Sequence, residues 1–405
     1  MPSRTASKVT TGHRLRRRVL AAVGAAFVAV PAANVASASV TSAVAPVAPA
    51  TGGRVDLTIP KFSHGTTITN RLFPITTTKQ MMSFGHEGPT VLRQETTLLN
   101  RTRTLRVNGQ DVQVVVSQFV AHGDGQIVET AIDYFAQADD GSVWYFGEDV
   151  STYENGVVAS HNGTWLAGRD GPPGMIMPAH PKVGDVYRPE NIPGLVFEET
   201  TVKATNLNVP GPSGTIHGAI RVEEHPADGD VETKIYAPGY GEFEATVPAS
   251  DEHVLSGVAV PTDVRGGSEP IPLNALSDRG RSIYDGAAST SLKDLRSVAA
   301  AAHTAWNQLA STKPPALLAA NVEGALDELD AALASRKRAD IAQAGLHIEF
   351  ATTDLEMQYT DYREVDHDRA GSWGRQRKLD EAAGDTAAVA SDKVIGRSIR
   401  DRLAS

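Results

Sequence analysis

The turn signals of this chain recur at an almost constant interval. Asn or Asp followed by Gly occurs at 108–109, 124–125, 140–141 and 155–156, at spacings of 16, 16 and 15 residues. Each dipeptide suits the positive φ angles of a two-residue hairpin turn, and β-branched residues are common between the turns. Long strands in such a meander twist and coil. The sequence therefore predicts a strongly curved antiparallel sheet or open barrel, with one concave face, over residues 55–258.

A change of composition near residue 259 separates this region from a helical one. The segment 259–272 is rich in Gly, Pro and Ser, residues 259–285 are interpreted as a linker, and Ala and Leu then recur at helical spacing. Helices are expected over residues 292–309, from the prolines at 314 and 315 to about 335, and over 341–359, 366–383 and 385–402. Their short connections favour an up-and-down bundle over residues 286–405. The predicted fold class is α+β, a curved sheet followed by a helical bundle.

The first 38 residues have the three parts of a secretory signal peptide. A basic stretch at 14–18 precedes an apolar stretch at 19–30, and Ala36-Ser37-Ala38 matches an A-x-A cleavage site. The apolar stretch is too short to span a bilayer comfortably. We therefore expect cleavage after Ala38, a secreted mature protein without membrane insertion, and a flexible linker over residues 39–54.

Charge and cysteine content exclude several classes of function. The chain has 38 Lys and Arg residues against 48 Asp and Glu residues, and six of the basic residues precede residue 39. The remaining 32 basic and 48 acidic residues give a net charge of −16. Such a surface repels nucleic acid and anionic lipid. Because the chain has no cysteine, disulfides, thiolate metal sites and cysteine nucleophiles are also excluded.

Several motifs carry a resemblance to known proteins. They read N-R-L-F-P at 70–74, D-Y-F-A-Q at 133–137, V-W-Y-F-G-E-D at 143–149, M-P-A at 177–179 and V-G-D-V-Y at 183–187. Together they resemble a functionally uncharacterised family of exported bacterial proteins of actinobacterial type. The carboxyl-terminal part, with Asp354-Leu355 and residues 373–376, resembles a helical module of actinobacterial secreted proteins. The segment Y-A-P-G-Y-G-E at 236–242 resembles the closing hairpin of lipocalin-like sheets. The resemblance implies export and a curved sheet but supplies no reaction.

One hairpin carries the main candidate site. If Asp140-Gly141 is a two-residue turn, Asp133 faces Glu148, Phe135 faces Phe146 and Gln137 faces Trp144. Directly opposed like charges destabilise a sheet, so a cation, an arginine or a shared proton is expected to relieve the pair.

Four interpretations of this pair stay open. With Glu129, four residues from Asp133, the pair predicts an oxygen-ligand site for a divalent cation such as calcium. The carboxylates could instead work as a general acid and base, or form a structural ion pair with Arg169, Lys182 or Arg188. In the fourth interpretation the pair has no special role, because Asp139 joins a three-residue loop, which slips the register by one residue and separates the pair, or because this face is exposed to water.

A second candidate metal site consists of Met175, Met177 and His180. These soft ligands could hold copper in a chain without thiols. The alternative interpretation is that the two methionines fill the core, and Gly174 and Pro178 indicate a loop here.

The leading functional prediction is a binding or accessory protein. Trp144, Phe146, Phe135, Asp133 and Glu148 are expected to line a concave site for a metal cation or for a small apolar or cationic ligand. No G-x-S-x-G elbow, phosphate loop, dinucleotide fingerprint or H-E-x-x-H motif is present. The alternatives are an extracellular hydrolase or lyase that uses Asp133 and Glu148, and a cell-envelope protein whose bundle binds a protein partner.

Overall fold

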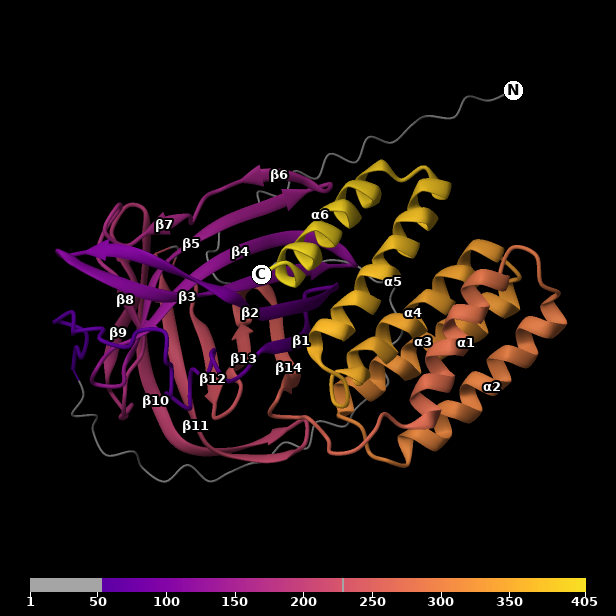
Figure 1. The fold of residues 1–405 in the computed structure, drawn as a ribbon, viewed down its shortest axis with the longest axis horizontal. Helices are drawn as coiled ribbons and strands as arrows, with labels where there is room; N and C mark the ends of the chain where they lie inside the picture. Colours follow the sequence, from indigo (N-terminus) through magenta and orange to yellow (C-terminus); the bar gives the residue numbers. More distant parts are fainter. Residues whose placement is uncertain (1–52, 228) are drawn as a thin grey trace.

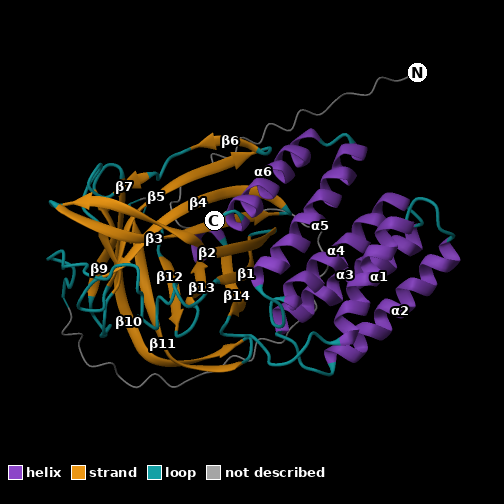
Figure 2. Cartoon of the chain, in the orientation of Figure 1, coloured by secondary structure: helices purple, strands orange, loops and turns teal. Residues whose placement is uncertain are grey.

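The computed structural model describes residues 53–227 and 229–405. The predicted signal peptide, and residues 39–52 of the predicted linker, lie outside this part of the chain. The strands and the helices form two parts that lie side by side along the long axis of the molecule (Figures 1 and 2). The predicted α+β fold class is confirmed.

The strands form one large antiparallel sheet. They are β1 (Gln80–Glu87), β2 (Thr90–Val107), β3 (Gln110–Gly123), β4 (Gln126–Gln137), β5 (Val143–Glu154), β6 (Val157–Ser160), β7 (Trp165–Leu166), β8 (Gly174–Met177), β9 (Val186–Ile192), β10 (Val196–Gly211), β11 (Gly214–Pro226), β12 (Glu232–Ala237), β13 (Gly241–Val247) and β14 (Glu252–Val260). The sheet order is β6-β5-β4-β3-β2-β1-β14-β13-β12-β11-β10-β9, and β7 and β8 pair with β5. The sheet is not closed, because β6 and β9 at its two ends do not pair with each other.

Three of the four predicted tight turns are confirmed. Both residues have positive φ in Asn108-Gly109 (50° and 79°), Asp124-Gly125 (47° and 76°) and Asn155-Gly156 (53° and 72°), as the tight hairpin turn requires. The prediction for Asp140-Gly141 is wrong. The N–H of Ala138 donates to the carbonyl of Ser142 at 2.8 Å, so residues 139–141 form the three-residue loop of the fourth interpretation, but Asp133 and Glu148 are not separated.

A β-bulge beside this loop restores the register that the loop shifts. Phe135 pairs with Tyr145, but Asp133 pairs with Glu148, because two residues of β5 lie opposite Tyr134. One of the two is Gly147, with φ of 117°. A Cβ there would lie 2.3 Å from the carbonyl oxygen of Trp165, so the bulge depends on glycine.

Six helices follow the sheet. They are α1 (Ile271–Gly286), α2 (Leu292–Ala310), α3 (Ala316–Ser335), α4 (Arg338–Glu356), α5 (Tyr362–Ala383) and α6 (Thr386–Leu403). The five predicted helices are present, but α1 occupies most of the predicted 259–285 linker, so that part of the prediction is wrong. Within the described residues, none of the helices is long and apolar enough to cross a membrane.

The helices pack against the outer side of the sheet. Met82 of β1 and Val258 of β14 belong to the same buried hydrophobic cluster as Leu273 of α1 and Leu318 of α3. Helix α6 contacts β2, β3, β4 and β6, and Figure 1 shows it lying over these strands. The sheet and the helices therefore share a buried hydrophobic cluster.

A buried ionic network joins the two parts. Its members are three arginines and three carboxylates: Arg93, Arg369, Arg402, Glu95, Asp354 and Asp366. Arg402 of α6 lies 2.7 Å from Glu95 of β2 and 2.6 Å from Asp366 of α5. Burial alone would raise the pKa of Glu95, but the charges of Arg402 and Arg93 outweigh it and hold this pKa well below its ordinary value.

Candidate functional site

A cavity of about 130 Å³ lies inside the curve of the sheet. Its walls come from β1–β5 and β8 on one side, from β12–β14 on the other, and from the segment 73–78. Strands that are far apart in the sheet order thus meet around one space. The predicted concave pocket is therefore present in the structure.

The cavity wall is both acidic and aromatic. Its carboxylates come from Glu129, Asp133, Glu148, Glu232, Glu242, Glu244 and Glu252, and its aromatic rings from Phe73, Phe119, Phe135, Tyr240 and Phe243. Among the lining residues that the structure describes, none is Lys, Arg or His. An electrostatic field of one sign in an apolar space favours a positively charged occupant.

Asp133 and Glu148 lie opposite each other, as predicted, and both are buried. The hydroxyl of Tyr145 donates to Asp133 Oδ1 at 2.8 Å, and that of Ser117 to Asp133 Oδ2 at 3.4 Å. Glu148 shares a hydrogen bond with Glu190, but its Oε1 atom has no hydrogen-bond partner among the described residues. Glu129 also lines the cavity and is buried.

Burial shifts the pKa values of these carboxyls upward. Desolvation and the charge of Asp133 raise the pKa of Glu129 to about 8. Desolvation raises the pKa of Asp133 to about 6 against the hydrogen bonds from Tyr145 and Ser117. Desolvation, Glu190 and Asp133 raise the pKa of Glu148 well above its ordinary value. The raised pKa values mean that ionising these buried carboxyls costs free energy. A cation in the cavity would lower that cost, because it stabilises the ionised carboxylates.

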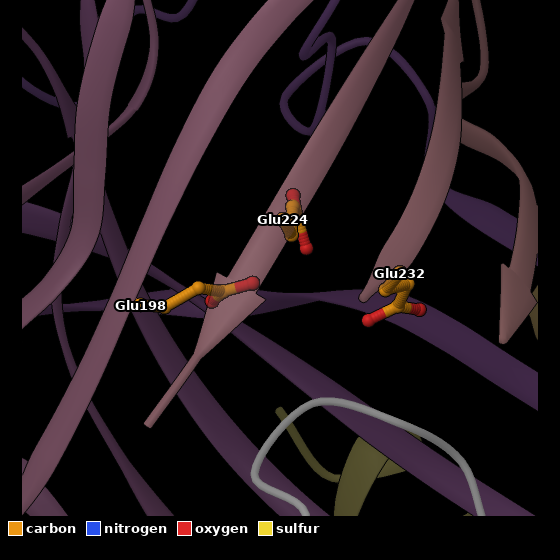
Figure 3. Close-up of side chains that lie close together, drawn as sticks. All are labelled: Glu198, Glu224 and Glu232. Carbon is orange, nitrogen blue, oxygen red and sulfur yellow. The ribbon is translucent and has the colours of Figure 1, made fainter. Parts of the chain in front are cut away.

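A second acidic group adjoins the cavity. Among the described residues, the group of at least three possible metal ligands whose atoms lie within 4.8 Å of one another consists of Glu198, Glu224 and Glu232. They come from the neighbouring strands β10, β11 and β12, with Glu224 between the other two (Figure 3). Glu232 also belongs to the cavity wall. We call these three residues the glutamate triad.

The lysine beside the triad is the buried cation of this region. Lys234 Nζ lies 2.6 Å from Glu224, 3.3 Å from Glu242 and 3.6 Å from Glu232. Burial would lower the pKa of Lys234, but the charges of Glu224 and Glu232 raise it well above its ordinary value. Its ammonium therefore stays charged and neutralises part of the negative charge.

Two of the predicted ligand-binding residues lie elsewhere. Trp144 and Phe146 pack edge-to-face against Phe62, with ring centroids 6.2 and 5.1 Å apart, and neither lines the cavity. The three-residue loop makes Tyr145, not Phe146, the partner of Phe135. Tyr145 therefore shares a face with Phe135, on which it stacks, and the expectation for Trp144 and Phe146 is wrong.

The predicted copper ligands are not brought together as an open site. Met175 and Met177 lie in β8, a strand and not the expected loop, and both belong to the hydrophobic core. Ile176 between them lines the cavity, so alternation turns the two methionines away from it. His180 is exposed. The structure agrees with the core-packing interpretation.

Sequence reasoning missed the carboxylates of β9–β12. A signal for them exists in the alternation along the strands. Glu198 has the same parity as the buried Val196 and Val202, and Glu224 the same parity as the buried Val222. A charged residue in phase with buried apolar residues faces the interior, which makes it a candidate site residue.

Comparisons of this chain with protein-family models, with curated proteins and with solved structures give no match. The resemblance to an exported bacterial family therefore stays a prediction, and the functional argument depends on the geometry of the site.

Glu129 provides a test of the buried acidic interior by pH. Its carboxyl titrates near 4.5 when unfolded and at about 8 when folded. Its contribution to stability is therefore complete below pH 4.5 and is lost as the pH rises to about 8, because over that range only the folded chain keeps the proton. In the wild type this group makes the free energy of unfolding fall with pH by up to about 1.4 kcal/mol per pH unit. Glu129→Gln should remove that part of the slope. Urea unfolding from pH 5 to 8.5 measures this difference.

The control for this experiment is Glu154→Gln, at an exposed position at the end of β5. Its curve of unfolding free energy against pH should run parallel to that of the wild type. If the curve for Glu129→Gln also runs parallel to that of the wild type, Glu129 does not keep its proton in the folded chain over this pH range. That result would contradict its raised pKa.

Proposed function

We propose that this protein binds a small organic cation, an ammonium group attached to an apolar body, in the cavity inside the curved sheet. The observation that carries the proposal is the composition of the wall, where seven carboxylates and five aromatic rings occur with no basic side chain among the described lining residues. The carboxylates complement the charge of the ligand. The rings contribute apolar contact and cation–π attraction.

The size of the cavity supports a ligand with a single ring. Its volume of about 130 Å³ is close to that of an engineered cavity of about 150 Å³ that holds benzene. Glu148 is the best-placed partner for the ammonium group, because it is almost completely buried and its Oε1 lacks a hydrogen bond within the described part of the chain. Phe135 lies in the same wall.

Isothermal titration calorimetry with benzylammonium tests this proposal. We expect saturable binding, and binding at least tenfold weaker for benzyl alcohol, which has a similar size but no charge. Glu148→Gln should weaken benzylammonium binding at least tenfold, since charge-assisted contacts in a buried site contribute about 1.5–3 kcal/mol.

Asp149→Asn is the matched control. Asp149 is the next residue in the sequence, is more than half exposed and accepts a hydrogen bond from Tyr134 away from the cavity. Its variant should bind as the wild type does. Equal affinity for the alcohol and the ammonium, or unchanged binding by Glu148→Gln, would contradict the proposal.

An extracellular hydrolase or lyase is the second candidate function. It is supported by the different environments of the paired carboxyls, since Asp133 accepts two hydroxyl hydrogen bonds while Glu148 has the carboxyl of Glu190 as its hydrogen-bond partner. Carboxyls in different environments can divide the roles of acid and base. Turnover that is lost in both Asp133→Asn and Glu148→Gln would support this function.

The proposed place of action is outside the cell. The basic stretch, apolar stretch and A-x-A site within residues 1–38 support export. Amino-terminal sequencing of the protein from the medium of a host that exports it should give a mature chain beginning at Ser39. A mature chain beginning at Met1 or Pro2 would contradict this.

A further inference from the structure

The glutamate triad lies in a row of oxygen-bearing side chains that crosses four strands. Tyr187 of β9 pairs with Thr200 of β10, Thr200 with Glu224 of β11, and Glu224 with Glu232 of β12. Directly paired residues point to the same face of a sheet. Glu198, two residues before Thr200, shares that face and completes the group. Five oxygen-bearing side chains thus face one region of the interior.

Two hydroxyls of this row have no hydrogen-bond partner among the described residues. They are Tyr187 Oη and Thr200 Oγ1, and both side chains are fully buried. Because Tyr187 pairs with Thr200 and Thr200 with Glu224, both hydroxyls belong to the face of the sheet that carries the triad. A buried hydroxyl without a partner costs about 1–3 kcal/mol. Two of them on the face of the converging carboxylates indicate a site that a ligand would complete.

From this arrangement we propose that the glutamate triad, with Tyr187 and Thr200, binds one divalent metal ion with calcium as the preferred ion. Calcium takes six to eight oxygen ligands, and carboxylates can coordinate it through one or both oxygens. Three carboxylates and two hydroxyls supply such a set without nitrogen or sulfur. Magnesium is less suitable, because it usually keeps several water molecules and this site is buried.

The charge balance also fits a divalent ion. Burial raises the pKa of Glu198 and that of Glu232 well above the ordinary value, so a metal ion that binds there would displace their protons. The three ionised carboxylates would then carry three negative charges beside the single positive charge that Lys234 shares with Glu242, and a divalent ion offsets two of them. Lys234 has a further partner in Glu242, at 3.3 Å on the cavity side, so its ammonium can move toward Glu242 when a metal ion binds to Glu224.

The test is a calcium titration of the full chain after removal of metal by a chelator, without any organic cation. Calorimetry should show one calcium ion per chain. Glu198→Gln should weaken calcium binding at least tenfold, and magnesium should bind at least tenfold more weakly than calcium. Because this titration contains no benzylammonium, its result is independent of the proposed organic ligand.

Glu199→Gln is the control variant. Glu199 is adjacent in the sequence but faces the other side, where it pairs with Arg188 at 2.8 Å, so its variant should bind calcium as the wild type does. The far-UV circular dichroism spectrum and the unfolding midpoint in chelator verify that Glu198→Gln is folded. Absence of calcium binding in the wild type, or equal binding by Glu198→Gln and Glu199→Gln, would overturn the proposal, as would equally tight binding of magnesium.

The variant Lys234→Met distinguishes between two interpretations of the triad, a metal site and a cluster of ion pairs. Without its ammonium the triad should bind calcium more tightly, so we expect calcium to raise the melting temperature of Lys234→Met at lower concentrations than it does for the wild type. If the triad only pairs with Lys234, the variant is destabilised and calcium does not restore it, which would overturn the proposal.

Discussion

Replacing Asp366 with asparagine is expected to lower the free energy of unfolding by about 3–5 kcal/mol. Asp366 is 1% exposed and accepts hydrogen bonds from Arg402, at 2.6 and 2.7 Å, and from Arg369, at 2.8 Å. Asparagine keeps the size of the side chain but removes its charge. The three guanidinium groups of the network would then share only Glu95 and Asp354. Urea denaturation at pH 7 measures the loss.

The control for Asp366→Asn is Asp340→Asn in α4. Asp340 pairs with Lys337 at 3.6 Å, and both side chains are largely exposed, so its loss should cost at most about 1 kcal/mol. Similar losses in the two variants would show that burial does not strengthen the network between the sheet and the helices.

Gly147→Ala should destabilise the protein by roughly 3 kcal/mol or more, because two costs combine at this position. The φ of 117° is unfavourable for alanine, and the added Cβ would lie 2.3 Å from the carbonyl oxygen of Trp165 and 2.8 Å from Leu166 Cα. Since the bulge places Glu148 opposite Asp133, we also expect weaker benzylammonium binding. Urea denaturation and calorimetry measure the two effects.

Gly109→Ala provides the comparison for Gly147→Ala. Gly109 has φ of 79°, but its Cβ would have no neighbour within 4 Å, so only the backbone cost of about 1–2 kcal/mol applies. An equally small loss at Gly147 would mean that the neighbouring strand can move aside and that the bulge tolerates a side chain.

Local chemistry made much of the fold predictable. Asn108-Gly109, Asp124-Gly125 and Asn155-Gly156 form the predicted turns, because their conformation depends on the two residues of the turn itself. The helices after residue 290 were predicted from apolar periodicity and from the prolines at 314 and 315. Helix α1 was missed because its flanking Gly, Pro and Ser residues masked a short apolar repeat that includes Leu273, Leu276 and Ile283.

Asp133 pairs with Glu148, although the condition on which that pairing was expected, a two-residue turn, is not met. The assumed two-residue turn is a three-residue loop, which shifts the register, and the bulge at Gly147 shifts it back. A glycine inside a strand pattern is a known signal of a bulge. The same missed shift explains why Phe146, and not Tyr145, was expected opposite Phe135.

The sequence by itself determined the antiparallel sheet, three of its turns and the helices after residue 290, because these depend on residues close together in the chain. Only the structure showed the bulge that aligns Asp133 with Glu148. Only the tertiary structure decided that the glutamate triad adjoins the cavity and that the helices share an ionic network with the sheet. Alternation indicates which face of a strand a carboxylate occupies. It does not say which distant strand lies across the interior. The packing of those strands sets the distances between charged groups and their burial, and these control the electrostatic interactions.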